Sequence, residues 1–184
     1  KEEIRKIAEK IGLLVAKKPD SQEICFIPDN DYAGYIERES GKQFKTGNFV
    51  DKDGNVLGQH KGLIHYTVGQ RKGLGLSLGT PAFVLELRPD TNEVVIGTNE
   101  DTFHDSLVAN KLNWMSIEKL DGEMMVCAKI RYSHQGELCK IRMNGENEVI
   151  CSFQNPVRAI TPGQAVVFYQ GDVVVGGGTI VKTL

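Results

Sequence analysis

The sequence lacks the features that mark membrane, secreted and disulfide-scaffold proteins. Across its 184 residues no apolar run approaches the roughly 20 residues that a membrane-spanning helix needs. The first residues, KEEIRKIAEK, are charged and helical in pattern, unlike a secretory signal. The four cysteines are too few and too scattered for a disulfide scaffold. We therefore expect a protein of the reducing cytoplasm with no membrane contact.

Several common catalytic and binding motifs are absent as well. The sequence has no defensible Ser-His-Asp arrangement, no HExxH and no GxxxxGK(S/T) phosphate loop. Cys127, Cys139 and Cys151 are evenly spaced, but no CxxC motif and no matching histidine pair accompany them, so we expect no metal site. The formal net charge of −2 gives no overall support for nucleic-acid binding. Any such role must rest on local basic patches.

The composition, 40% hydrophobic and 25% charged, is typical of a globular protein with one domain or two small ones. An opening helix is predicted from the apolar spacing of Ile4, Ile7, Ile11 and Leu14. That apolar face needs a covering surface, either the downstream domain or a preceding domain outside this sequence, and we favour the second. After Gly12, residues 13–16 are predicted to form a short strand or extended segment.

The remaining pattern predicts a mainly β protein with short N-terminal helices. A second helix is expected to start around residues 28–31 and to end by Ser40-Gly41. Two hairpins, over residues 44–58 and 82–97, flank a glycine-rich segment that we expect to be irregular. Together they predict a small central α+β domain built from β-hairpins.

Short strands separated by turn residues then follow without intervening helices. This pattern predicts a C-terminal six-stranded β-barrel. Its strands are expected at residues 106–114, 124–133, 137–143, 147–153 and 165–170, and then at 173–175 with 178–182. We expect domains at 1–40, 41–105 and 106–184.

One cysteine is unlike the others in its surroundings. Cys25 lies in the polar stretch KKPDSQEICFI, outside any predicted strand, where an ordered loop would present its thiol. The alternative is an incidental thiol packed beside Phe26. Cys139 and Cys151 alternate with apolar residues and are predicted to be core residues of barrel strands.

Two groups of basic residues are candidates for RNA contact. If the strands around them form a hairpin, Lys129 and Arg131 share a patch with Lys140 and Arg142, with Tyr132 beside it as a stacking surface. The alternative is an ordinary solvated strand face. Lys61, Arg71 and Lys72, together with His60 and His65, lie in the glycine-rich segment, where the backbone can approach a phosphate closely.

Four motifs together resemble the family of tRNA-specific 2-thiouridylases, which place sulfur on the wobble uridine of certain tRNAs. The resemblance runs in order from about residue 10 to residue 180. It implies the end of an N-terminal ATP-pyrophosphatase domain of the PP-loop type, then a central domain and a C-terminal β-barrel. The family's SGGVDS-like motif and first catalytic cysteine are missing here. The motifs are PDSQEICFIPDNDYAGYI, GQHKGLIHYTVGQRKGLGL, KIRY and TPGQAVVFYQGDVVVGGGTI.

The resemblance also implies roles for individual residues. Cys25 matches the second catalytic cysteine, which receives sulfur as a persulfide and ends in a disulfide with the first. Arg131, Tyr132 and Gln164 match tRNA-contact positions, and Lys129 adjoins them. ATP, accompanied by Mg²⁺, would be bound by the missing domain, so no cofactor is expected in this chain. The implied partners are tRNA and a persulfide-donating sulfur carrier protein or cysteine desulfurase.

These implications leave two hypotheses of different classes. The first is part of a tRNA-uridine 2-sulfurtransferase, inactive in isolation, that supplies the persulfide cysteine and tRNA-binding domains. The second is a non-catalytic RNA-binding β-barrel module in which Cys25 is unreactive. Under the first, the thiolate form of Cys25 is required, and the charges of Asp20 and Glu23 oppose it.

Overall fold

The computed structural model describes residues 2–17, 24, 26–27 and 31–184. The chain divides into two compact units, Lys1–Gln43 and Phe44–Leu184. The first contains helices and the second is built from strands, which confirms the predicted mainly β class. Among the described residues, no helix is long and apolar enough to cross a bilayer.

Helix α1 (Glu2–Lys10) ends one turn earlier than its apolar spacing suggests. The N–H groups of Gly12 and Leu13 donate to the carbonyls of Glu9 and Ala8, a Schellman cap in which Gly12 is left-handed with φ of 76°. The predicted extended segment after Gly12 is wrong. Residues 14–17 form a turn instead, closed by the N–H of Ala16 on the carbonyl of Leu13.

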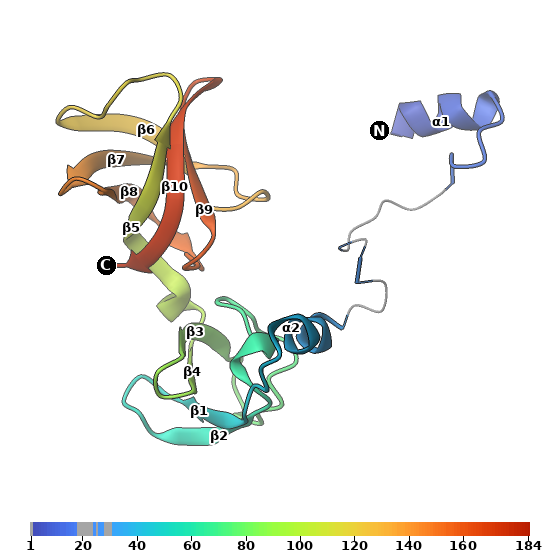
Figure 1. Cartoon of the computed structure of the whole chain (residues 1–184), viewed down its shortest axis with the longest axis vertical. Helices are drawn as coiled ribbons and strands as arrows, with labels where there is room; N and C mark the ends of the chain where they lie inside the picture. Colours follow the sequence, from blue (N-terminus) through green and yellow to red (C-terminus); the bar gives the residue numbers. More distant parts are fainter. Residues whose placement is uncertain (1, 18–23, 25, 28–30) are drawn as a thin grey trace. The chain divides into compact units, whose positions relative to one another are not determined.

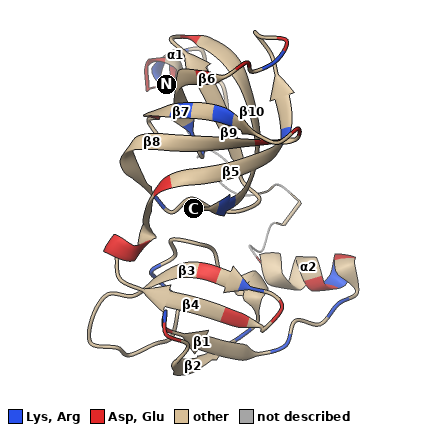
Figure 2. Cartoon of the chain, turned by 90° about the vertical axis from the view of Figure 1, so that its left-hand side faces the viewer, with Lys and Arg blue, Asp and Glu red and all other residues tan. Residues whose placement is uncertain are grey.

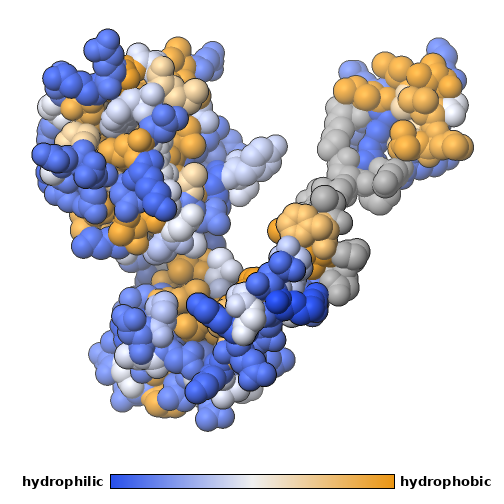
Figure 3. Space-filling view, in the orientation of Figure 1, coloured by the Kyte–Doolittle hydropathy of each residue, from blue (hydrophilic) through white to orange (hydrophobic). Residues whose placement is uncertain are grey.

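The apolar face predicted for the opening helix is present, and its side chains are exposed in the described part of the chain. Ile4, Ile7 and Ile11 each keep more than half of their surface exposed, and Leu14 is fully exposed. Figure 3 shows this face as hydrophobic surface on the segment that carries α1.

Helix α2 (Tyr32–Ser40) has the boundaries that its sequence predicts. The Asp31 carboxylate caps its start by accepting the Gly34 N–H at 3.0 Å. Gly41 ends it in the left-handed conformation with φ of 64°, its N–H bonded to the carbonyl of Glu37.

The second unit opens with a four-stranded sheet in the order β2-β1-β4-β3. Both predicted hairpins are present, and the parallel pairing of β1 with β4 joins them. Phe49, Val84 and Val94 are fully buried between the sheet and the glycine-rich segment, where Tyr66 and Leu74 contact them. The strands are β1 (Gly47–Val50), β2 (Val56–His60), β3 (Phe83–Arg88) and β4 (Glu93–Gly97).

Most of the glycine-rich segment is irregular, as expected. After β2 it contains only a 3₁₀ turn, η1 (Leu63–His65), before β3 begins. Its path is still fixed by the backbone, because the Gly69 N–H donates to the Val84 carbonyl and the Val84 N–H donates to the Gln70 carbonyl. This part of the segment therefore lies along β3.

Six antiparallel strands close into a barrel in the order β10-β5-β8-β7-β6-β9 (Figure 1). Closure leaves no free sheet edge. Every predicted strand of this region is present, although several are longer or shorter than predicted. The strands are β5 (Phe103–Trp114), β6 (Glu123–Lys129), β7 (Glu137–Asn144), β8 (Glu148–Arg158), β9 (Ala165–Gln170) and β10 (Val173–Thr183).

Alternation along the strands fills the barrel interior. On β7, Cys139 and Ile141 are fully buried while Lys140 and Arg142 are exposed. Cys151 on β8 is also fully buried, so both cysteines are core residues as predicted. The two thiols are hydrogen-bonded, and this bond together with burial raises the pKa of Cys151.

A short connection over residues 98–102 joins the sheet to the barrel, and Asp101 fixes it. Its carboxylate accepts the N–H and the hydroxyl of Thr98, each at 2.8 Å, and pairs with Lys52 in the β1–β2 turn. The hydrogen bond from Lys52 is the largest of the causes that lower the pKa of Asp101 to about 2.

Replacing Asp101 tests this anchor. Asp101→Ala is expected to lower the free energy of unfolding by about 1 kcal/mol at neutral pH, because Thr98 and Lys52 lose a charged acceptor. A carboxylate with a depressed folded-state pKa stabilises fully above its unfolded pKa, and that contribution is lost as pH falls through its folded pKa. The difference between the proteins should therefore shrink as pH falls from about 4 toward 2. Urea unfolding at neutral and acidic pH measures it, and a pH-independent difference would contradict this role.

Candidate nucleic-acid interface

Cys25 lies outside the described residues, and so do Asp20 and Glu23. Its described neighbours are Ile24 and Phe26, both exposed. The Phe26 ring lies 5.5 Å from the ring of Tyr35 in α2, measured between centroids. An aromatic contact thus connects the residue that follows Cys25 to α2.

Arg131 lies in the loop after β6, not within the strand as predicted. The strand ends at Lys129, and the chain turns so that the His134 N–H bonds to the Arg131 carbonyl. The Nη1 group of Arg131 donates to the carbonyls of Arg158 and Ala159 at 3.1 and 3.3 Å. Its Nε and Nη2 have no partner within the described structure. The planar edge that suits a phosphate or carboxylate is therefore left available, on a side chain already fixed in orientation.

Two further side chains of this loop are available to a ligand. Tyr132 is fully exposed. The Lys129 ammonium lies 5.5 Å from the ring centroid of Tyr169, and no carboxylate in the described part of the chain pairs with it. An exposed aromatic ring in the same segment as two cations without a carboxylate partner can stack on a nucleobase while the cations contact the backbone.

The electrostatics of the loop favour an anion. Burial and the charge of Arg131 lower the pKa of His134, and Lys129 adds to this effect while Glu137 opposes it. The neutral imidazole accepts the Ile130 N–H at Nδ1, at 3.4 Å. Arg131 and Lys129 thus place positive charge beside His134, which Glu137 opposes in part, in a chain whose net charge is −2.

Gln164 is connected to the same loop through hydrogen bonds. The Ala159 carbonyl that accepts from Arg131 also accepts the Thr161 hydroxyl at 3.1 Å. Thr161 begins the turn that presents Gln164, whose N–H donates to the Thr161 carbonyl at 3.2 Å. The Gln164 side chain itself is exposed. The structure therefore connects Arg131 and Gln164, 33 positions apart in the sequence, through Ala159.

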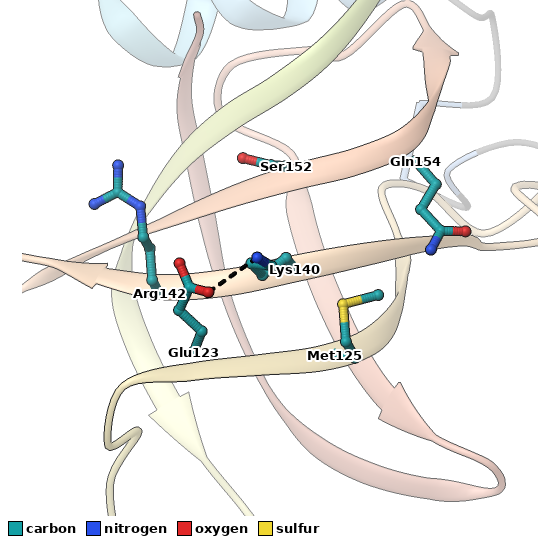
Figure 4. A pocket seen from close by; sticks show the side chains of 6 residues that line it. All are labelled: Glu123, Met125, Lys140, Arg142, Ser152 and Gln154. Atoms are coloured by element: carbon teal, nitrogen blue, oxygen red, sulfur yellow. Dashed lines mark ion pairs between the residues drawn. The ribbon is translucent and has the colours of Figure 1, made fainter.

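The predicted patch of four cations does not form. The β6–β7 register places Lys140 opposite Met125 and Arg142 opposite Glu123, at the far end of the hairpin from Lys129. Glu123 neutralises Lys140 through an ion pair of 2.9 Å, as Figure 4 shows. Lys140 and Arg142 do face outward as expected, but they lie along β7 away from the loop over residues 130–136, which contains Arg131.

The glycine-rich segment contributes a second set of cations. Lys61, Arg71 and Lys72 are exposed, and none pairs with a carboxylate among the described residues. The Gln70 side chain accepts the Thr67 N–H and donates to the Lys72 carbonyl, both at 3.0 Å, which holds this turn in shape.

His60 does not belong to this exposed group, although the sequence placed it there. It is 1% exposed, its Nδ1 accepts the Gly62 N–H at 3.0 Å and its Nε2 lies 3.1 Å from the Asn92 carbonyl. Both ring nitrogens are therefore occupied by backbone groups. His60 is a structural residue that joins the segment to the sheet.

Sequence reasoning missed Arg158, the residue that joins the two sets of cations. At the end of β8, its guanidinium carbon lies 5.3 Å from the ring centroid of Phe83. Nε donates to the Asn99 side chain at 3.4 Å, and Nη2 reaches the Gly69 carbonyl at 3.5 Å. Nothing in the sequence distinguishes Arg158 from an exposed strand-end cation, because all three partners are remote along the chain.

The described residues contain no cluster of His, Cys, Asp or Glu able to hold a metal ion. In the view of Figure 2, acidic and basic residues are mixed over the barrel and the sheet without one continuous basic face. Any nucleic-acid contact is therefore expected to be local. The candidate residues are Lys129, Arg131, Tyr132 and Gln164, which we call the barrel RNA site after this expected contact, and Lys61, Arg71 and Lys72 on the glycine-rich segment.

Comparison with known families divides the chain into three parts. A model described as aminomethyltransferase beta-barrel domain matches residues 104–180. One described as tRNA methyl transferase PRC-barrel domain matches residues 34–98, and a tRNA methyl transferase HUP domain matches residues 1–29.

Curated relatives match nearly the whole chain. A tRNA-specific 2-thiouridylase MnmA of Lachnoclostridium phytofermentans is 66% identical over 182 residues, covering 99% of this chain and 51% of the relative. The chain belongs to the tRNA-specific 2-thiouridylase family. Two further 2-thiouridylases, from Caldanaerobacter subterraneus and Clostridium botulinum, are each 54% identical over 99% and 98% of the chain. The chain spans about half the length of these 2-thiouridylases.

The electrostatics of this 2-thiouridylase loop can be tested by titration. The His134 imidazole is expected to titrate below the ordinary histidine pKa of about 6.5. Arg131→Ala should raise that pKa toward the ordinary value, because a neighbouring positive charge is removed. NMR titration of the histidine ring protons measures the shift. Arg142→Ala, at the far end of the hairpin, is the matched control and should leave it unchanged; an equal shift in both variants would contradict a local field.

Proposed function

We propose that this chain supplies the tRNA-binding domains and the persulfide cysteine of a tRNA-uridine 2-sulfurtransferase. The observation that carries the proposal is 66% identity to a tRNA-specific 2-thiouridylase over 99% of the chain. The expected domains, 1–40 as the end of the catalytic domain, 41–105 as the central domain and 106–184 as the barrel, belong to this proposal.

The barrel RNA site is suited to a structured RNA. Arg131 would use its free Nε and Nη2 edge on a phosphate, since Nη1 is already held by carbonyls. Tyr132 would stack on an unpaired base and Lys129 would contact the backbone. The exposed amide of Gln164 would add a donor and an acceptor, which can read a base edge or a 2′-hydroxyl.

The cations of the glycine-rich segment would contact a second stretch of phosphates. Lys61, Arg71 and Lys72 are presented on a backbone that β3 holds in place. Counterion release on neutralising several phosphates would supply most of the affinity and make it depend on salt.

The chemistry proposed for Cys25 is sulfur transfer. A carrier protein or a cysteine desulfurase would leave a terminal sulfur on its thiolate as a persulfide. That sulfur would replace the oxygen at C2 of the wobble uridine. The thiolate of the family's other catalytic cysteine would attack Cys25 Sγ, so that the persulfide S–S bond breaks, its outer sulfur remains on C2 and a disulfide joins the two cysteines. A reductant must regenerate the thiols before the next turnover, which suits the reducing cytoplasm.

ATP with Mg²⁺ would activate the uridine oxygen for departure. The resemblance to the family implies that ATP is bound by the PP-loop domain, in the part of the family's length that this chain does not span. For the same reason, the chain alone is expected to be inactive.

Removing Arg131 tests the RNA surface. Arg131→Ala is expected to weaken binding of a tRNA transcript about tenfold and to reduce the slope of log affinity against log salt by about 0.7–0.9, the contribution of one phosphate contact. Filter binding or fluorescence anisotropy across a salt series measures both. Arg142→Ala removes the same charge elsewhere on the barrel and should change neither by a comparable amount. Equal losses in both variants would mean that only net charge matters.

The role of Cys25 is tested in the full-length enzyme. Cys25→Ser should bind tRNA and ATP normally but yield no 2-thiouridine, because a hydroxyl cannot carry the transferable sulfur. Mass spectrometry of digested tRNA measures the product. Cys127→Ser is the matched control and should thiolate normally. Normal thiolation by Cys25→Ser would instead favour a non-catalytic RNA-binding module.

A further inference from the structure

We infer that Arg158 is a positioning residue that holds the glycine-rich segment and the barrel RNA site in one arrangement, so that a single tRNA engages both. This inference rests on the proposed function. Arg158 stands between the two sets of cations, with its backbone facing one and its side chain facing the other.

The backbone around Arg158 organises the barrel RNA site. The carbonyls of Arg158 and Ala159 hold Arg131, and the Ala159 carbonyl also receives the Thr161 hydroxyl. Ala159 adopts a left-handed conformation with φ of 55°, and its N–H donates to the Thr102 carbonyl at 2.7 Å. The carbonyls that orient Arg131 are thus fixed by the connection between sheet and barrel.

The side chain of Arg158 contacts the sheet domain at three places. Its guanidinium covers the Phe83 ring of β3, binds the Asn99 side chain in the connection and reaches the Gly69 carbonyl in the glycine-rich segment. Gly69 lies two positions before Arg71. A planar fork that stacks on a ring while donating sideways makes all three contacts at once, which an ammonium does not.

Close packing reinforces this contact. A Cβ placed on Gly69 would lie 2.6 Å from the Cβ of Ala159, closer than side chains approach, and Gly69 has φ of +84°. The glycine-rich segment therefore packs at Gly69 directly against Ala159, whose carbonyl holds Arg131.

A fixed distance between the two sets of cations would increase the affinity for one tRNA. When two contact areas are held at the separation of their phosphates, the second contact forms at a high effective concentration. If the spacing is released, the contacts made by Arg71 and Lys72 are lost even though both side chains remain. Arg158 thus acts through other residues, and its own charge is not the reason for its effect.

A double-mutant cycle on tRNA binding by the whole chain tests this inference. Arg71→Ala alone is expected to weaken binding of a tRNA transcript about fivefold. Arg158→Ala should weaken it about tenfold, and Arg71→Ala added to Arg158→Ala should cost less than twofold more. Independent, multiplying losses would overturn the inference, because they would mean that Arg71 binds RNA equally well without Arg158.

Arg158→Lys separates positioning from charge. This variant keeps the positive charge but loses the planar guanidinium. It should therefore bind tRNA as weakly as Arg158→Ala, and adding Arg71→Ala to it should again cost less than twofold. Wild-type affinity in Arg158→Lys would show that charge alone matters. Circular dichroism melting shows whether Arg158→Ala folds. If it does not fold, Arg158→Lys takes its place in the double-mutant cycle. A merely structural defect would lower the melting temperature while leaving the loss from Arg71→Ala intact, and that result would also overturn the inference.

The controls distinguish this inference from the proposed function. Arg142→Ala should bind within about twofold of the wild type, as expected for a distant exposed charge. If Arg131→Ala weakens binding while both Arg158 variants behave like Arg142→Ala, the positioning role fails and the RNA surface stands. If the wild-type chain does not bind tRNA, the proposed function fails first.

Discussion

The hydrogen bonds from Arg131 to the carbonyls of Arg158 and Ala159 are the interaction on which the arrangement of the site depends. They bring the loop after β6 to the end of β8, where the barrel meets the sheet. Without them the loop would be a long hairpin connection held mainly by its own turn. With them, Arg131 and the Thr161–Gln164 turn meet at the Ala159 carbonyl, and the exposed Tyr132 follows Arg131 in the chain.

A slightly acidic protein can have a positively charged site, because the positions of its charged side chains matter more for the local potential than the net charge. Elsewhere on the barrel and sheet, Lys140, Lys52 and Arg88 are neutralised by carboxylates. Arg131, Lys129 and Arg71 have no such partner among the described residues. Because the field of an unpaired cation extends about 8–10 Å at physiological salt, neighbouring unpaired cations act together while the paired ones contribute little. At His134, burial is the main cause of the lowered pKa, and the charges of Arg131 and Lys129 add to it.

Local sequence patterns predicted the fold, but they predicted only part of the candidate site. Alternation placed Cys139 and Cys151 in the core, and Asp31 and Gly41 marked the ends of α2, because these signals act within a few residues. The burial of His60 and the position of Arg158 were not predictable, because their partners are 32 and 59 or more positions away. Strand parity placed Arg131 on the outer face, but it cannot show where a strand stops. The chain leaves β6 at Lys129 for contacts with β8 that no local pattern encodes.

The two thiols buried in the barrel are protected from side reactions in an enzyme that is proposed to carry a persulfide. A persulfide can be intercepted by any competing thiolate, so spare cysteines in such a protein are a hazard. Cys139 and Cys151 are excluded from solvent by the closed strands, and the hydrogen bond with Cys139 together with burial raises the pKa of the Cys151 thiol, which keeps it protonated. Thiols in that state are poor nucleophiles. The closed barrel thereby prevents two of the four cysteines from reacting with the persulfide, and both side chains contribute to core packing.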